Sequence, residues 1–142
     1  MSPLGLSAPE RRCLVADDSR IVRRVSARIL SDLGFEMVEA ATAAEALDQC
    51  RLAMPDAVLL DIHISPELHN GLQVISAIRA LPGGKDVKII VCTTERTPAN
   101  IIRALDAGAD EYIMKPFDSD IVTSKFILTG LVPAQGLTAE VA

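Results

Sequence analysis

The sequence contains no tryptophan, few aromatic residues of any kind (3%) and fewer basic than acidic side chains. Its 14 Lys and Arg residues against 19 Asp and Glu residues give a formal net charge of −5. This charge argues against DNA, RNA or an anionic membrane as the main partner. No apolar run approaches the ~18 residues of a membrane helix, and the first residues show no charged region followed by a long apolar stretch. We therefore expect a cytoplasmic protein that is neither inserted nor exported.

Cysteine is scarce as well. Cys13, Cys50 and Cys92 are odd in number, have no metal-binding spacing and lie inside apolar runs, which is typical of reduced core thiols in the cytosol. No glycine-rich loop follows Ala16, and this absence disfavours a nucleotide-binding domain.

The chain is rich in aliphatic residues. Hydrophobic residues make up 49% and charged residues 23% of the 142 positions, a length and balance that predict one domain. Residues 1–11 mix Pro, Gly, Ser and charges without periodicity, so we expect a loose leader there. The domain is expected over residues 12–131, and residues 132–142 are expected to form a flexible tail.

Short apolar segments alternate with segments of helical spacing five times. Strands are expected at 13–17, 35–40, 57–60, 87–92 and 111–114. Helices are expected to start at Asp18 or Ser19, at the Thr42–Glu45 capping box, after Gly71, at Thr97-Pro98, and at Asp118 or Ser119. This alternation predicts a parallel sheet covered by helices on both faces, a three-layer α/β sandwich.

The apolar residues of each expected helix recur at a spacing that predicts a core-facing side. In the first helix they are Ile21, Val22, Val25, Ile29 and Leu33, with Gly34 as the stop. In the fourth they are Ile101, Ile102 and Leu105.

Polar residues follow four of the expected strands at the point where each strand ends. These are Asp17 and Asp18, Asp61, Thr93 and Lys115. Because ligands of open α/β sheets bind outside the carboxyl ends of the strands, we expect these side chains to lie together.

Their chemistry suits phosphoryl transfer. Carboxylates gathered at one edge repel one another, so their pKa values rise unless a cation neutralises them. Mg²⁺ prefers oxygen ligands and is typically held by one or two carboxylates plus phosphate oxygens. Asp61 can then act as nucleophile toward phosphorus, while Lys115 stabilises the phosphoryl charge and Thr93 donates a hydrogen bond to it.

Each residue also has an ordinary structural interpretation. Asp17 and Asp18 can serve as a helix N-cap and its neighbour. Asp61 can be a strand-ending carboxylate, Thr93 a β-branched strand residue and Lys115 a solvated lysine. All of these interpretations together require a coincidence, and the functional one does not.

In this arrangement the chain resembles the receiver domain of bacterial response regulators. The family pattern is an acidic pair after the first strand, an aspartate ending the third, Thr or Ser ending the fourth, and Lys-Pro after the fifth; here the last is Lys115-Pro116. The resemblance covers residues 12–130. The segments EYIMKPFD and DIVTSKF most resemble stand-alone, chemotaxis-type regulators of alphaproteobacteria.

The resemblance implies a flavodoxin-like fold with strand order 2-1-3-4-5. It also implies that Asp61 accepts phosphate from a histidine kinase or histidine phosphotransfer protein, in chemotaxis and motility or in a phosphorelay. The protein would then be a phosphoacceptor with self-catalysed phosphotransfer and autodephosphorylation rather than an enzyme. Mg²⁺ would be held by Asp18, Asp61 and the His63 backbone carbonyl, with Asp17 reaching it through water.

Signal output is implied at the face made by the fourth helix, fifth strand and fifth helix. There Tyr112 is expected to act with Thr93 as a rotameric switch, although simple half-buried packing is the alternative for this tyrosine. The Lys115-Pro116 bond is expected to be cis, as the resemblance implies.

The loop after the phosphorylated position departs from the family pattern. The stretch Ile62–Asn70 is longer than usual and contains Ser65-Pro66 in place of Met-Pro, which bears on dephosphorylation. Thr94 and Glu95 after the switch threonine are a second departure. His63 and His69 also permit a transition-metal site, although no helical or cysteine-paired spacing organises them.

Three other functions remain open on the sequence. A phosphatase of the haloacid dehalogenase type also combines Asp, Thr or Ser, Lys and Mg²⁺, but it carries Asp-x-Asp after its first strand, where this chain has adjacent Asp17 and Asp18. The chain can also be the receiver of a longer regulator whose effector is absent. A degenerate receiver that only binds a partner is the third, yet no acidic or switch position is missing.

Overall fold

The computed structural model describes residues 11–64, 71–94 and 98–134. Its five strands form one parallel sheet in the order β2-β1-β3-β4-β5, which confirms the predicted flavodoxin-like fold. The strands are β1 (Arg11–Ala16), β2 (Phe35–Ala40), β3 (Ala57–Asp61), β4 (Lys88–Thr93) and β5 (Glu111–Met114). The helices are α1 (Arg20–Asp32), α2 (Ala43–Leu52), α3 (Gly71–Ala80), α4 (Pro98–Ala107) and α5 (Ser119–Leu128).

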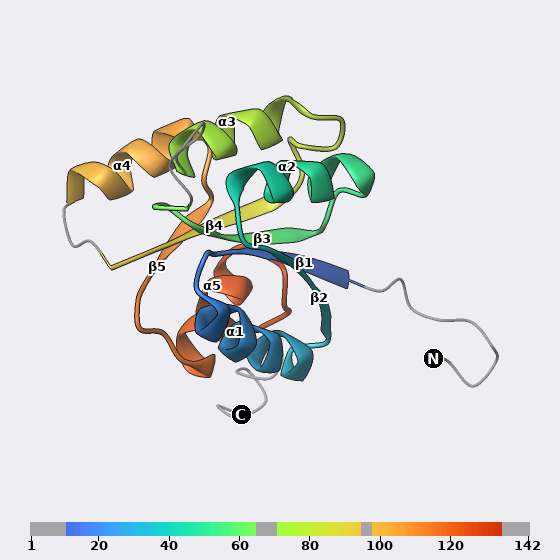
Figure 1. The fold of residues 1–142 in the computed structure, drawn as a ribbon. Coiled ribbons are helices and arrows are strands. Elements are labelled where there is room, and N and C mark those ends of the chain that lie inside the picture. The colour runs from blue at the N-terminus through green and yellow to red at the C-terminus, as the bar shows by residue number, and fades with distance from the viewer. Residues whose placement is uncertain (1–10, 65–70, 95–97, 135–142) are drawn as a thin grey trace.

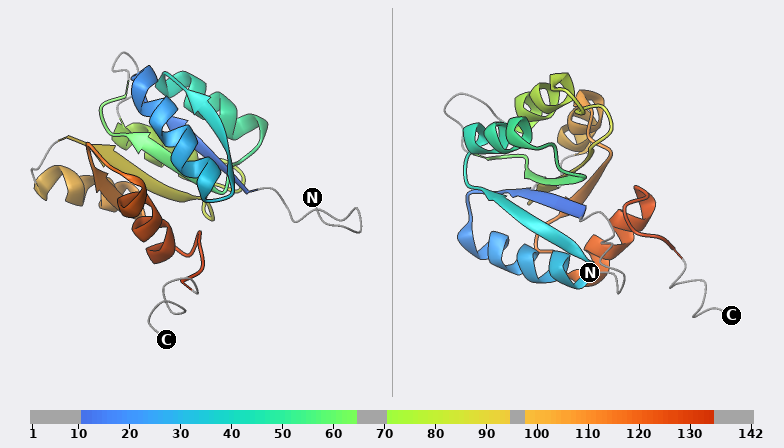
Figure 2. Two further views of the ribbon diagram at one scale, coloured as in Figure 1. Left: turned by 90° about the horizontal axis from the view of Figure 1, so that it is seen from below. Right: turned by 90° about the vertical axis from the view of Figure 1, so that its right-hand side faces the viewer.

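Helices cover both faces of the sheet. Helices α2, α3 and α4 lie on one face, and α1 and α5 lie on the other, as Figure 1 and the right-hand view of Figure 2 show. Two apolar cores follow from this arrangement, one between the sheet and α2, α3 and α4, the other between the sheet and α1 and α5. Central strand β3 is buried along its whole length, so its last residue, Asp61, is held on a rigid base.

Capping residues start three of the helices as the sequence predicts. Ser19 rather than Asp18 caps α1, accepting a hydrogen bond from the Val22 N–H at 3.3 Å. Asp118 caps α5 in the same way. At α2, Thr42 Oγ1 accepts from the Glu45 N–H at 3.1 Å, and the Glu45 carboxylate accepts from the Ala41 N–H rather than from that of Thr42. The Lys115-Pro116 bond is cis, as expected.

The predicted core sides of α1 and α4 are partly wrong. In α1 the side chains of Ile21 and Val25 are 75% and 46% exposed, while Ser26 is buried beside Ile29 and Leu30.

In α4, Ala104 is buried, whereas Ile102 and Leu105 are 56% and 40% exposed. Ala104 belongs to the core on this face of the sheet, and Ala107 packs against that core one turn later. Apolar spacing fixed the period of both helices but not the side that faces the sheet.

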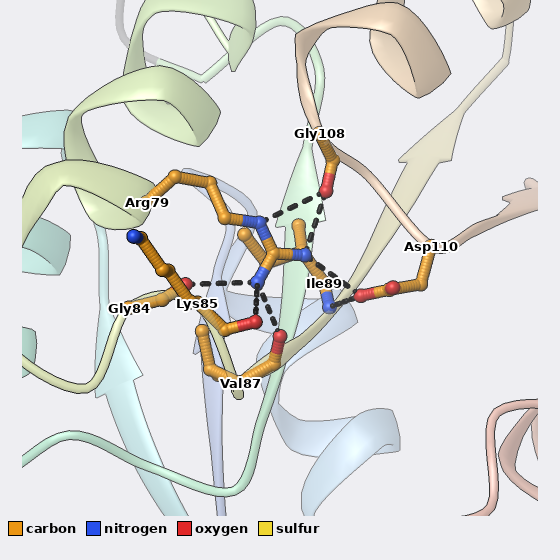
Figure 3. Close-up of polar contacts among 7 residues, drawn as sticks. All are labelled: Arg79, Gly84, Lys85, Val87, Ile89, Gly108 and Asp110. Atoms are coloured by element: carbon orange, nitrogen blue, oxygen red, sulfur yellow. Dashed lines mark hydrogen bonds and ion pairs between the residues drawn. The ribbon is translucent and has the colours of Figure 1, made fainter.

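Arg79 joins three separate segments at the amino-terminal end of β4 (Figure 3). Its guanidinium donates to the Gly108 carbonyl at 3.0 and 2.6 Å, to the Val87 carbonyl at 2.6 Å and to Asp110 Oδ2 at 2.8 Å. Asp110 Oδ2 also accepts from the Ile89 N–H at 2.8 Å. One cation therefore ties the end of α3 to the start of β4 and to the turn that follows α4.

Several predicted features lie outside the described residues. They are the leader up to residue 10, His69 and most of the long loop, Glu95, the Thr97 cap, and the tail beyond residue 134. The domain boundaries at residues 12 and 131 stay a prediction. No helix in the described part of the chain is long and apolar enough to cross a membrane.

Candidate phosphoryl-transfer site

The predicted site residues meet at the carboxyl edge of the sheet. Asp17 follows β1, Asp61 ends β3, Thr93 ends β4 and Lys115 follows β5. The strand order makes β1, β3 and β4 neighbours, so Asp17 and Asp61 come from adjacent strands. Asp18 joins them, since all three aspartates offer carboxylate oxygens within 4.8 Å of one another.

Asp17 is buried and has both carboxylate oxygens engaged. It is 2% exposed; Oδ1 accepts from the Ser19 N–H at 2.9 Å and Oδ2 accepts from Lys115 Nζ at 2.6 Å. Its own N–H donates to the Ala40 carbonyl at 3.0 Å. Asp18, next in the chain, is exposed. The adjacent acids therefore differ in role, one fixed inside the site and the other at its mouth.

Asp61 is held in a tight turn at the end of β3. Its side chain is 10% exposed, its Oδ1 accepts from the His63 N–H at 3.0 Å, and its carbonyl accepts from the Ile64 N–H at 3.0 Å. Asp61 Oδ2 lies 3.5 Å from Lys115 Nζ. One carboxylate oxygen is thus fixed by the backbone, and the other faces the lysine and the remaining acids.

The site shifts two pKa values in directions with clear causes. Burial raises the pKa of Asp61, and the charges of Asp17 and Asp18 raise it further; the His63 N–H and the Lys115 ammonium offset only part of this. Burial alone lowers the pKa of Lys115, but the hydrogen bond to Asp17 and the charges of Asp61 and Asp17 outweigh it, so that pKa rises. The site holds a charged lysine and more negative charge than that lysine neutralises.

The donor set fits a magnesium ion. Opposite ligands of an octahedral Mg²⁺ are about 4 Å apart, so carboxylate oxygens within 4.8 Å can share one ion directly or through its bound water. Among the described residues this cluster contains no histidine, and His63 is exposed. The described residues therefore give no support to a transition-metal site at His63, and His69 lies outside the described residues.

Thr93 and Tyr112 stand on neighbouring strands. Thr93 is 1% exposed at the end of β4, and in the register of β4 with β5 it pairs with Met114, two residues beyond Tyr112. Tyr112 is half-buried and lines a groove of about 500 Å³ between α4 and β5, together with Ile101 and Ile102. The Lys125 ammonium lies 4.5 Å from the centre of the tyrosine ring.

Two site features did not emerge from the sequence. Lys115 is closer to Asp17 than to Asp61, because side-chain reach depends on the backbone after β5 and not on spacing along the chain. Gly71 packs against the backbone of Ile62, where a Cβ would lie 2.5 Å from the Ile62 carbonyl oxygen. Its N–H also donates to that oxygen at 3.0 Å, so α3 begins directly against the turn that holds Asp61. The Asn70-Gly71 pair was the only sequence signal for this contact.

Residues 13–126 match the response regulator receiver domain family. The chain belongs to this family, and it is a two-component phosphoacceptor signalling domain. Receiver domains bind Mg²⁺ at an acidic pocket and interact with histidine kinases or phosphotransfer proteins. The haloacid dehalogenase alternative finds no support.

The chain is similar to a regulator that it covers almost completely and to a longer one of which it covers less than half. It is 37% identical over 115 residues to the chemotaxis protein CheY1 of Helicobacter pylori strain J99, covering 80% of this chain and 92% of that protein. It is 42% identical over 106 residues to the response regulator MprA of Mycobacterium sp. strain KMS, covering 75% of this chain but 44% of that protein. The structure of CheY4 of Vibrio cholerae superposes with a TM-score of 0.78 at 26% identity, covering 84% and 98% of the two chains.

Proposed function

We propose that Asp61 is the phosphoacceptor of this receiver domain and that Asp17, Asp18, Thr93 and Lys115 assist the transfer. One observation carries the proposal: the Asp61 carboxylate is buried at the end of the central strand, with one oxygen 3.5 Å from the Lys115 ammonium and two further acids beside it. Asp17 has both oxygens engaged and Asp18 is at the surface, so neither is placed as Asp61 is.

The transfer step needs no base. An Asp61 carboxylate oxygen attacks phosphorus, while the bond from phosphorus to the donor breaks and its electron pair leaves with the donor group. The leaving group is the imidazole of a phosphohistidine or the carboxylate of a small acyl phosphate. Lys115 stabilises the phosphoryl oxygens, and Thr93 at the end of β4 donates a hydrogen bond to the new phosphate. Attack of water on the same phosphorus returns free Asp61, which is autodephosphorylation.

Mg²⁺ is the cofactor that the carboxylates suit. Asp18 and Asp61 would hold it with the His63 backbone carbonyl, and Asp17 would contact it through water, since both Asp17 oxygens already accept hydrogen bonds. When bound, Mg²⁺ supplies positive charge that neutralises the acids and the incoming phosphoryl group. Without bound Mg²⁺, the hydrogen bond from the Lys115 ammonium holds the Asp17 carboxylate in place.

Output is proposed at the face made by α4, β5 and α5. Tyr112, the groove beside it and the exposed Ile102 and Leu105 support this assignment, because they offer an apolar surface next to the site. The three buried free cysteines support a reducing, cytoplasmic location. No DNA contact is proposed, in line with the net charge of −5.

Phosphorylation by a small acyl phosphate tests the proposal. Intact wild-type protein should gain the mass of one phosphoryl group when Mg²⁺ is present and none when it is removed by chelation. Asp18→Asn should raise the Mg²⁺ concentration needed, whereas the control Asp106→Asn on the exposed face of α4 should not. Equal labelling of wild type and Asp61→Asn would contradict the assignment of the acceptor.

A further inference from the structure

Helix α5 places an ammonium group against the single tyrosine of the chain. Lys125 lies on α5, which packs against β5, and its Nζ is 4.5 Å from the centre of the Tyr112 ring. An ammonium group at this distance is attracted by the face of an aromatic ring. The same Nζ lies 3.0 Å from Glu111 Oε1. The lysine therefore joins the carboxylate of one residue of β5 to the ring of the next.

Glu111 fixes the lysine in this place. Its Oε1 accepts from Lys125 Nζ at 3.0 Å and also from the Tyr112 N–H at 3.0 Å. The side chains of Lys125 and Glu111 are 22% and 23% exposed, so solvent screens their attraction less than that of a fully exposed ion pair. The carboxylate thus ties the ammonium to the backbone of the residue whose ring the ammonium contacts.

The other contacts of the tyrosine ring do not set its direction. Tyr112 packs partly against the core on the α3 and α4 face of the sheet, and it lines the groove with Ile101 and Ile102. In the described part of the chain its hydroxyl makes no hydrogen bond. Because apolar contacts are non-directional, the cation is the contact that favours one orientation of the ring.

We propose that Lys125, held by Glu111, keeps the Tyr112 ring at the surface of the unphosphorylated protein and thereby limits the population of the active conformation. The proposal rests on the function proposed above, in which Tyr112 belongs to the output face. An inward turn of the ring toward Thr93 takes it away from the ammonium, so the lost contact opposes that turn. Lys125 is then a positioning residue, which acts on the switch through the tyrosine.

An ordinary alternative is that the ion pair only holds α5 on the sheet. Two fully buried side chains of α5, Val122 and Phe126, already anchor the helix in the core on that face. An ion pair near the surface adds little to such an anchor. A purely structural role also predicts no change in the orientation of Tyr112 when the charge of Lys125 is removed.

The test observes the ring directly, because the chain has one tyrosine. In wild-type protein with isotope-labelled tyrosine and lysine, the ring current should shift the NMR signals of the Lys125 ε-methylene protons upfield. Beryllofluoride, a mimic of the phosphoryl group, should remove this shift when it binds with Mg²⁺. Lys125→Met keeps the apolar stem without the charge, so the Tyr112 ring signal of the free variant should move toward its beryllofluoride-bound position.

The affinity for the mimic should change with the population of the active conformation. Lys125→Met should bind beryllofluoride about three- to fivefold more tightly than wild type, the effect of one partly exposed cation–π contact. Removing a cation by itself weakens binding of an anion, so net charge cannot account for this gain. Lys125→Arg keeps a cation that can pair with Glu111, and it should restore the wild-type ring signal and affinity. Glu111→Gln should shift both in the same direction as Lys125→Met, but by less.

A matched control removes the same charge elsewhere. Lys85→Met changes an exposed lysine in the loop before β4 and should leave the ring signal and the affinity for beryllofluoride unchanged. A wild-type ring signal in Lys125→Met, or equal or weaker binding of the mimic, would overturn the proposal, and so would the absence of the ring-current shift in wild type. Failure of wild type to bind the mimic or to react with a small acyl phosphate would instead contradict the proposed function.

Discussion

At the scale of single residues, one ammonium group faces more carboxylates than it can neutralise. Lys115 Nζ is 2.6 Å from Asp17 and 3.5 Å from Asp61, and Asp18 adds a third carboxylate at the mouth of the site. Burial of Asp61 among these charges raises its pKa. The site is therefore prepared for a cation and a phosphoryl group, and in their absence it reduces the stability of the fold.

Asp61→Asn should stabilise the metal-free protein at neutral pH. The pKa of Asp61 is higher in the folded than in the unfolded state, so the folded state binds more protons and stability is lost as pH rises through the folded-state value. Removing the charge should raise Tm by a few degrees, which corresponds to a gain of ~1 kcal/mol in the free energy of unfolding for a domain of this size. The gain should disappear below the unfolded-state pKa of aspartate and shrink with added Mg²⁺. Thermal melts across pH measure this, with exposed Asp106→Asn as control; a Tm gain that does not depend on pH would contradict the explanation.

Ser26→Ala should also stabilise the protein, for a different reason. Ser26 is 1% exposed on α1, and in the part of the chain that the structure describes its Oγ has no hydrogen-bond partner. Alanine removes a buried unsatisfied hydroxyl and has a better helix propensity, so we expect a gain of about 1 kcal/mol in the free energy of unfolding. Urea unfolding measures it. The control Ser124→Ala, at an exposed position of α5, changes helix propensity but removes no buried hydroxyl. An equal gain in the free energy of unfolding for this control would show that the buried Ser26 hydroxyl does not destabilise the protein.

The site residues were predictable for one reason, and the contacts between them were not. Asp17, Asp61, Thr93 and Lys115 stand at the ends of apolar runs, and a parallel sheet gathers such positions at one edge. The pairing of Lys115 with Asp17 and the partnerless Ser26 depend on side-chain directions in three dimensions. No spacing along the chain encodes those directions.

At the scale of elements, α4 is anchored more firmly at its end than along its length. Among its described side chains Ala104 is the buried one, while the turn after it is held by Arg79 through Gly108 and Asp110 (Figure 3). Gly108 has a φ of +121°, a conformation that favours glycine, and it brings its carbonyl to the guanidinium. The proposed output face therefore carries a helix whose C-terminal end is fixed and whose body is lightly packed.

Arg79→Ala should loosen this anchor. It leaves the Gly108 and Val87 carbonyls without their charged donor, which we expect to cost about 2 kcal/mol of stability. Hydrogen exchange should rise most in α4 and at Ala109 and Asp110. Arg79→Lys should recover little, because one ammonium cannot reproduce the planar fork. Exposed Arg103→Ala is the control, and uniform exchange across the fold in Arg79→Ala would show that the anchor is not local.

Elements were predicted better by type than by orientation. Strands β1, β3 and β4 emerged because each is largely a continuous buried apolar run, whereas β2 emerged from its alternating pattern. The caps of α1, α2 and α5 emerged from their Ser, Thr and Asp residues. The prediction of which sides of α1 and α4 are buried was partly wrong, because the exposed Ile21, Val25 and Ile102 share the helical period of the core residues.

At the scale of the whole molecule, the proposed output requires that phosphate at the sheet edge changes a surface elsewhere. Thr93 lies at the end of β4 and Tyr112 on the adjacent strand beside the groove under α4. We propose that a phosphate on Asp61 offers Thr93 a new acceptor and that movement of Thr93 frees space for the tyrosine ring. Phosphorylation can shift the equilibrium between the inactive and active conformations only by the difference in its interaction free energy with the two, a few kcal/mol at most.

Thr93→Ala and Tyr112→Ala should each separate phosphorylation from output. Both variants should still be labelled on Asp61, but each should lose most of the gain in affinity for the downstream partner that phosphorylation gives wild type. Binding of phosphorylated and unphosphorylated protein measures that gain. Exposed Ser31→Ala on α1 is the control, because it lies outside both the Thr93–Tyr112 pair and the proposed output face. If both variants keep the full gain, the coupling runs through the loop after Asp61 instead.

The identity of the phosphorylated residue tests the central claim most directly. In this measurement, wild-type protein would be treated with a small acyl phosphate and Mg²⁺ and then with borohydride. Borohydride converts an aspartyl phosphate to homoserine. Peptide mapping should then find homoserine at position 61 and at no other aspartate, and none in Asp61→Asn. Homoserine at Asp17 or Asp18, or a base-stable phosphate on Thr93 or Thr94, would contradict the account.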